Sequence, residues 1–150
     1  MKDMIQKMYS LLLVALQLAA LVYLALTGPL IARELGLFLI QCVGLYIGLA
    51  ALWRMAGAKW RIVPDPHPRT KLVTRGIYRH IRHPMYTSLL IISLVWIVLK
   101  PDVDRMLFWL GLAIVLWLKM LREERLLQEK FGDKYHMYSR QTKRLIPGII

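Results

Sequence analysis

The residues best suited to chemistry are crowded between positions 72 and 88, where a basic and aromatic segment runs into a long apolar stretch. Hydroxyl and imidazole groups at the edge of a hydrophobic block indicate a ligand site. Two histidines three residues apart, without a nearby cysteine or third histidine, are a poor metal-binding set, so we expect no metal there. The residues concerned are Gly76, Tyr78, His80, His83, Pro84 and Tyr86.

A second group of charged side chains ends the last apolar run: Lys119, Arg122, Glu123 and Glu124. A carboxylate close to a membrane is costly unless it is paired or functional. Helical periodicity places Glu124 on the apolar face, with Glu123 beside it and one turn after Lys119. Two interpretations stay open, a Lys119–Glu123 surface pair or acids that face the basic segment across a pocket.

The composition places both groups in a membrane protein. The 150 residues are 57% hydrophobic with a mean hydropathy of +0.46, more than a water-soluble core requires. The net charge of +12 does not indicate nucleic acid, because the basic residues lie between apolar blocks. Anionic lipid headgroups are the better partner for the basic loop. The single cysteine, Cys42, excludes an intrachain disulfide.

The hydrophobic pattern predicts an all-α, polytopic membrane protein with about four transmembrane helices in a single domain, residues 1–150. Gly28 and Pro29 end the first helix, and Pro84 begins the third, where its missing N–H costs nothing. The first run is long for a signal peptide, so we expect a retained helix. The expected helices are 9–26, 34–55, 84–99 and 105–131, the last continuing from the membrane into water.

The distribution of basic residues predicts the orientation. A proline-rich loop over 56–71 joins the second and third helices. With four spans, one side of the membrane receives Lys2 and Lys7, eight basic residues between Arg54 and Arg82, and eight from Lys119 to Arg144, against Arg33, Lys100 and Arg105 opposite. Both termini, the loop and the active site are therefore expected to be cytoplasmic.

Two spacings allow further expectations. If their segment is helical, Arg75, Arg79 and Arg82 share one basic face that meets anionic lipid. Gly44 and Gly48 are spaced for close helix contact, either with the first helix, which we favour, or with a second copy of the chain. The oligomeric state is left open.

Several short motifs occur together in the second half of the chain. They are Leu72-Val73-Thr74-x-Gly76-x-Tyr78, Arg82-His83-Pro84-x-Tyr86, Glu123-Glu124, Phe131-Gly132-x-x-Tyr135, Tyr138 and Leu145-Ile146-Pro147. In order and spacing they resemble the isoprenylcysteine carboxyl methyltransferase and phospholipid methyltransferase superfamily. The resemblance implies an integral membrane enzyme that uses S-adenosyl-L-methionine, bound between the cytosolic loop and the C-terminal helix.

The resemblance also implies site residues. It favours Glu123 as the acid at the cofactor, whereas periodicity favours Glu124, and both stay candidates. Ser88 stands where the family usually has glycine, and Lys119 stands where prenylcysteine enzymes place an arginine near the substrate carboxylate. The implied cofactor contacts are Lys71, Leu72, Val73, Tyr78, His83, Pro84, Met85, Tyr86 and one or both glutamates.

The methyl acceptor is expected to be lipophilic, with Lys119, Arg122 and Tyr86 as candidates to orient it. A carboxylate needs no base at neutral pH, whereas an amine such as that of phosphatidylethanolamine must first lose a proton. No dedicated base is evident, which favours a carboxylate over the alternative of phospholipid N-methylation. An NADPH-dependent enzyme like the sterol reductases, which usually have asparagine at the position of Pro84, and a non-catalytic membrane scaffold are further alternatives.

Overall fold

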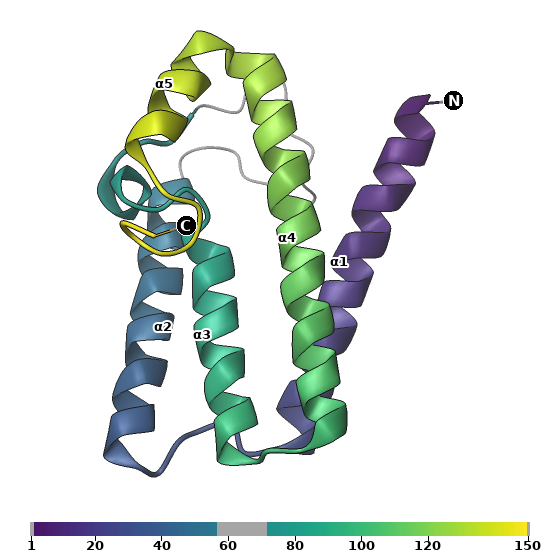
Figure 1. Ribbon diagram of the computed structural model, residues 1–150, viewed down its shortest axis with the longest axis vertical. Coiled ribbons are helices and arrows are strands. Elements are labelled where there is room, and N and C mark those ends of the chain that lie inside the picture. Colours follow the sequence, from purple (N-terminus) through teal and green to yellow (C-terminus); the bar gives the residue numbers. More distant parts are fainter. Residues whose placement is uncertain (1, 57–71, 150) are drawn as a thin grey trace.

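Four long helices dominate the computed structural model, which describes residues 2–56 and 72–149 (Figure 1). A short 3₁₀-helix precedes the third helix and a short α-helix follows the fourth. Within the described ranges only an isolated bridge between Ile81 and Lys143 pairs extended backbone, so the fold is all-α. The helices are α1 (Lys2–Thr27), α2 (Leu35–Met55), η1 (Gly76–Arg79), α3 (Pro84–Leu99), α4 (Val103–Phe131) and α5 (Asp133–Gln141).

A helix lies over each of the four predicted ranges, and the differences are at the ends. The first helix begins at Lys2, seven residues before the predicted start at 9, because its polar first turns continue the same helix. It ends at Thr27, directly before Gly28 and Pro29. Helix α5 was not predicted, because its polar sequence carries no strong apolar period.

The long helices pack in two pairs, α2 along α3 and α1 along α4. The glycine face of α2 lies against α3. A Cβ added to Gly44 would lie 2.9 Å from the Ile91 side chain, and one added to Gly48 would lie 2.6 Å from Ser88 Oγ. Both predictions for these glycines, contact with the first helix or with a second copy, are therefore wrong.

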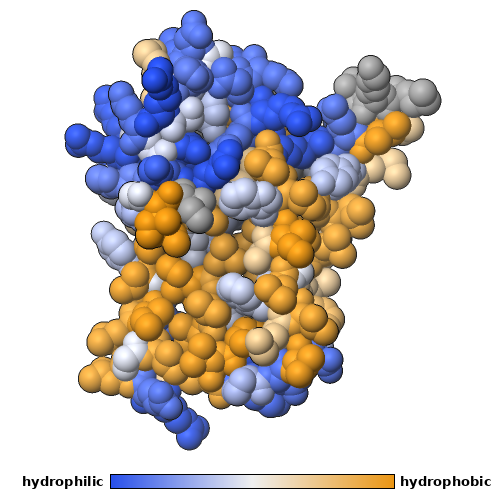
Figure 2. Space-filling model, viewed as in Figure 1, coloured by the Kyte–Doolittle hydropathy of each residue, from blue (hydrophilic) through white to orange (hydrophobic). Residues whose placement is uncertain are grey.

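The outer surface of the bundle is strongly apolar. Two helices, over Met4–Thr27 and Leu35–Met55, are long and apolar enough to cross a membrane, and Pro84–Leu99 is a shorter apolar helix. Most of α1 and α2 is exposed; Trp53, for example, is 72% exposed. Figure 2 shows a broad apolar band bounded by hydrophilic ends. Such a band is costly in water, so it indicates a membrane protein.

At the end of the bundle opposite α5, one buried cation joins three helices. Arg105 is 2% exposed, and its guanidinium donates hydrogen bonds to the carbonyls of Leu24 (3.2 Å) and Trp96 (2.7 Å) and to Thr27 Oγ1 (2.5 Å). These acceptors belong to the last turns of α1 and α3. A Cβ at Gly28 would lie 2.6 Å from this guanidinium, which explains a glycine directly after α1.

Candidate functional site

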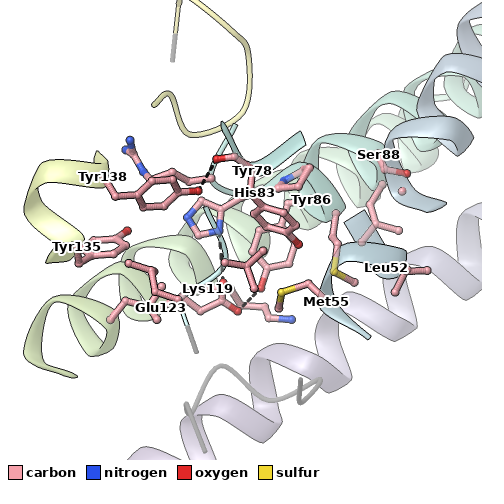
Figure 3. A pocket seen from close by; sticks show the side chains of 18 of the residues that line it. Leu52, Met55, Tyr78, His83, Tyr86, Ser88, Lys119, Glu123, Tyr135 and Tyr138 are labelled. Atoms are coloured by element: carbon pink, nitrogen blue, oxygen red, sulfur yellow. Dashed lines mark hydrogen bonds and ion pairs between the residues drawn. The ribbon is translucent and has the colours of Figure 1, made fainter. Parts of the chain in front are cut away.

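A cavity of about 290 Å³ is lined by residues from α1 to α5, η1 and the segment before η1 (Figure 3). Its volume is close to the lower end of the roughly 300–1,000 Å³ typical of ligand pockets. Figure 3 shows Tyr135 and Tyr138 at one end of the cavity and Leu52 and Ser88 at the other. The cavity thus runs from a polar end under α5 to a more apolar end between α2 and α3.

Most of the residues predicted to contact a cofactor line this one cavity. Lys119, predicted to orient the acceptor, lines it as well. Glu124 and Arg122 are not among its lining residues, and Lys71 lies outside the described residues. Cofactor contact itself stays a prediction. The predicted residues around the cavity are Leu72, Val73, Tyr78, His83, Pro84, Met85, Tyr86 and Glu123.

The backbone that presents this segment is held by α2 and by the C-terminal tail. Gly76 has φ +66°, and a Cβ there would lie 2.6 Å from Arg54 Nε at the end of α2. After η1 the chain pairs with the tail, because the Arg82 and His83 amides donate to the carbonyls of Lys143 (2.7 Å) and Arg144 (3.0 Å). The tail therefore fixes the backbone from which His83 enters the site.

Glu124 is the centre of an ion cluster beside the cavity. Its carboxylate accepts from Arg82 Nε at 2.9 Å and from Arg144 Nη2 at 2.8 Å. Burial alone would raise its pKa, but hydrogen bonds from His83, Arg144 and Arg82 hold the pKa well below its usual range. The predicted basic face is wrong for Arg82, because the chain leaves the helical path after η1 and turns this side chain inward.

Glu123 faces the cavity and binds different partners. The Tyr86 hydroxyl donates to Glu123 Oε1 at 2.5 Å, and His83 Nδ1 lies 3.4 Å from Glu123 Oε2. His83 Nε2 lies 3.5 Å from Glu124 Oε1, so the imidazole is between the two carboxylates. Burial lowers the pKa of His83, but the hydrogen bonds and charges of Glu123 and Glu124 outweigh burial and raise it. This arrangement favours a positively charged imidazole.

Lys119 is buried instead of forming a surface pair. It is 2% exposed, its Nζ donates to Gln17 Oε1 at 2.6 Å, and it lies 5.3 Å from the centre of the Tyr86 ring. The Lys119–Glu123 surface pair is thus wrong. Arg122 instead faces α1, where it donates to the Gln6 carbonyl at 3.0 Å. The structure does not bring Arg122 to the cavity.

Several lining residues were not predicted as site residues from the sequence, and three of them carry polar groups that matter here: Gln17, Tyr135 and Tyr138. Tyr135 is 4% exposed, and its hydroxyl has no hydrogen-bond partner among the described residues. Burial raises its pKa, and it also raises the pKa of Tyr138 to about 12, so both hydroxyls stay protonated donors. The two tyrosines belong to the motifs quoted above. Because α5 was not predicted from the sequence, their position at the cavity could not be inferred. For Gln17 the signal in the sequence was a glutamine in the middle of an apolar run.

These features define a membrane-embedded helical bundle with a ligand cavity at one end. The chain belongs to the phospholipid methyltransferase family, whose model matches residues 31–134. That range includes α2, α3 and α4 with most of the cavity, but it excludes Gln17, Tyr135 and Tyr138. The family and the apolar surface together make this a membrane protein.

Two relatives show how far the likeness extends. The chain is 32% identical over 114 residues to the protein-S-isoprenylcysteine O-methyltransferase of Schizosaccharomyces pombe, which is 72% of this chain and 47% of that protein. The chain thus spans about half the length of this relative. It is also 38% identical over 64 residues to an uncharacterized protein of Haemophilus influenzae, which is 40% of this chain and 97% of that protein.

Proposed function

We propose that this protein transfers a methyl group from S-adenosyl-L-methionine to a lipophilic carboxylate at the membrane. The observation that carries the proposal is the junction of Tyr86, Glu123 and Lys119 between the polar and apolar ends of one cavity. A methyltransferase for lipids needs such a junction, because a charged cofactor and an apolar acceptor must meet. The family match and the likeness to a prenylcysteine methyltransferase support it.

The polar end fits the cofactor by the chemistry of its side chains. Glu123 would accept from the cofactor's ammonium, and the Tyr135 hydroxyl, which has no hydrogen-bond partner among the described residues, would donate to its carboxylate. His83, whose two ring nitrogens face Glu123 and Glu124, would hold Glu123 in place. Leu72 and Met85 supply apolar contact for the adenosyl group. When bound, S-adenosyl-L-methionine supplies a methyl group activated by the positive charge on sulfur.

The acceptor side fits an anion. Lys119 brings a buried positive charge to the cavity, which attracts a carboxylate and repels a protonated amine. In the proposed reaction a carboxylate oxygen forms the new bond to the methyl carbon as the methyl–sulfur bond breaks. The electron pair of that bond stays on sulfur, a methyl ester forms, and no proton moves. Alignment of the two reactants is therefore the main catalytic task.

Methylation of a phospholipid amine is the second candidate, and one observation favours it. Tyr86 donates a 2.5 Å hydrogen bond to Glu123, so this pair could take a proton from an ammonium through the Tyr86 oxygen. The pair provides the base that the sequence did not reveal. We rank this candidate second because Lys119 would oppose a cationic headgroup.

We further propose a four-pass arrangement with both termini and the active site in the cytoplasm. In Figure 1 the α1–α2 and α3–α4 links lie at one end of the bundle, and α5 lies at the other. Most of the basic residues that the structure describes lie at the α5 end, which supports a cytoplasmic location there. The exposed Arg75 and Arg79 would meet anionic headgroups.

The test of the function is calorimetric titration of the full chain in detergent with S-adenosyl-L-methionine. We expect binding by the wild type, and Glu123→Gln should weaken it about ten- to a hundredfold, since a charge-assisted hydrogen bond contributes roughly 1.5–3 kcal/mol. Glu129→Gln is the matched control, because Glu129 is exposed on the same helix and does not line the cavity. Binding of NADPH but not of S-adenosyl-L-methionine would reject the proposal in favour of a reductase, and binding of neither would favour a scaffold.

A further inference from the structure

Gln17 is the only described residue of α1 that lines the cavity. Its neighbours Leu16 and Leu18 are 46% and 52% exposed and belong to the apolar surface of the bundle. A carboxamide in such a helix is costly unless its polar atoms are satisfied. The residue also lies outside the range 31–134 that matches the family model, so the family match does not explain it.

The chemistry of its partner fixes how the carboxamide is turned. The Lys119 ammonium can only donate, so the atom 2.6 Å from Nζ must be the carboxamide oxygen of Gln17. The amide nitrogen, with its two N–H groups, is then left for other acceptors. Within 2–56 and 72–149 no acceptor takes a hydrogen bond from that nitrogen.

Lys119 is a buried cation with no ion-pair partner in direct contact among the residues that the structure describes. Among the described residues no carboxylate lies within 4.0 Å of its Nζ. Glu123, one turn further along α4, is engaged by Tyr86 and His83 instead. Buried charges in proteins are normally paired, so this ammonium and the neighbouring N–H groups form an incomplete anion site.

We propose that Gln17 and Lys119 together bind the carboxylate of the methyl acceptor, with the amide nitrogen and the ammonium as its two donors. This inference rests on the proposed function, which it deepens by assigning the residue that selects a carboxylate. Two convergent donors restore the forked recognition that a lone lysine lacks relative to arginine. In this arrangement the Gln17 amide and the Lys119 ammonium bind one carboxylate oxygen, and the other oxygen stays available to accept the methyl group.

The decisive variant is Gln17→Glu. Glutamate satisfies Lys119 at least as well as glutamine, so a purely structural role predicts no loss. A binding role predicts the opposite, because glutamate removes both N–H donors and places a negative charge against the incoming carboxylate. Gln17→Met, similar in size but without an amide, is the second variant in case the first fails to fold.

The experiment measures binding of two probes to the full chain in detergent without cofactor: N-acetyl-S-farnesyl-L-cysteine, a lipophilic carboxylate, and dodecylamine, a lipophilic amine. We expect Gln17→Glu to raise the Kd of the carboxylate about tenfold or more, and the Kd of the amine to stay or fall. Gln6→Glu is the matched control, because Gln6 is exposed on the same helix and is not a cavity residue.

Each outcome decides the matter. Unchanged carboxylate binding in both Gln17 variants overturns the inference, as does a wild type that binds no carboxylate. A calorimetric titration with S-adenosyl-L-methionine separates this failure from that of the proposed function. If carboxylate binding depends on Gln17 but S-adenosyl-L-methionine does not bind, the carboxylate site is supported and the methyltransferase function is rejected. If S-adenosyl-L-methionine binds but carboxylate binding does not depend on Gln17, the function is supported and the role of Gln17 is rejected.

Discussion

At the scale of single residues, the adjacent acids Glu123 and Glu124 differ because one residue turns a helix by about 100°. Glu124 points to the tail and is occupied by Arg82 and Arg144, whereas Glu123 lies in the cavity wall. Periodicity alone placed Glu124 on the apolar face, and it could not reveal that the partner arginines come from segments 42 and 20 residues away. Long-range pairing of this kind is invisible to a local pattern.

Glu124→Gln should destabilise the protein and make its melting temperature less dependent on pH in the acid range. Removing one partner from a largely buried ion pair costs about 3 kcal/mol, so the melting temperature at neutral pH should fall. Because the folded pKa of Glu124 is lowered, its stabilisation is present above the unfolded pKa and is lost as the pH falls below it. The loss begins near the unfolded pKa of about 4.3, so the melting temperature of the wild type should fall more than that of the variant between neutral pH and about pH 3.

Thermal denaturation in detergent over this pH range measures the effect, with Glu129→Gln as the control for a lost surface charge. His83 contributes with the opposite sign, since its pKa is raised and its stabilisation is lost as the pH rises through the folded value. The stabilisation by His83 is therefore lost at higher pH, so it does not obscure the fall of the melting temperature at low pH. Parallel acid limbs for the wild type and Glu124→Gln would contradict the assigned role.

At the scale of elements, the sequence predicted the parts whose signals are local. Pro84 begins α3 and Gly28 follows α1, as the turn chemistry of proline and glycine indicated. Helix α5 and the pairing of Arg82 with Lys143 were missed, because contacts between distant segments hold them in place. The same limit explains why the partner of Gly44 was misassigned, since small residues show that a helix packs closely but not against what.

At the end of the bundle opposite α5, Arg105 of α4 binds the last turns of α1 and α3, so its replacement should affect the packing of three helices. Lysine would keep the charge but lose the planar fork that reaches several acceptors at once. Arg105→Lys should lower the free energy of unfolding by about 3 kcal/mol, the contribution of roughly two charge-assisted hydrogen bonds. Chemical denaturation in detergent measures it, and cofactor binding should persist, since residue 105 lies about 21 Å along the helix from residue 119.

Arg33→Lys is the matched control, because Arg33 is an exposed arginine of the α1–α2 link, at the same end of the bundle. A stability loss confined to Arg105→Lys supports a specific role for the buried guanidinium. Equal stability of the two variants would show that Arg105 is replaceable by any cation, which would remove it from the determinants of the fold.

At the scale of the whole molecule, the apolar band and the uneven distribution of charge together indicate how the protein lies in the membrane. The band covers the outside of the helices, and the hydrophilic surface is far larger at the α5 end (Figure 2). The cavity lies where these two surfaces meet, with tyrosines on the polar side and Leu52 on the apolar side. A ligand with a charged head and an apolar tail matches this division, whichever acceptor the site takes.

Helix α3 tests the proposed arrangement of four spans, because its 16 residues extend about 24 Å, against roughly 30 Å for the hydrocarbon layer. Single cysteines in a Cys42→Ser background, placed at Lys7, Arg33, Val103 or Arg140, test it with a membrane-impermeant maleimide on sealed vesicles. All four positions are exposed, so access to reagent depends on the side of the membrane. We expect Lys7→Cys and Arg140→Cys to react from one side and Arg33→Cys and Val103→Cys from the other. Reaction of Val103→Cys from the side of Lys7→Cys would make α3 and α4 a re-entrant hairpin and leave two spans.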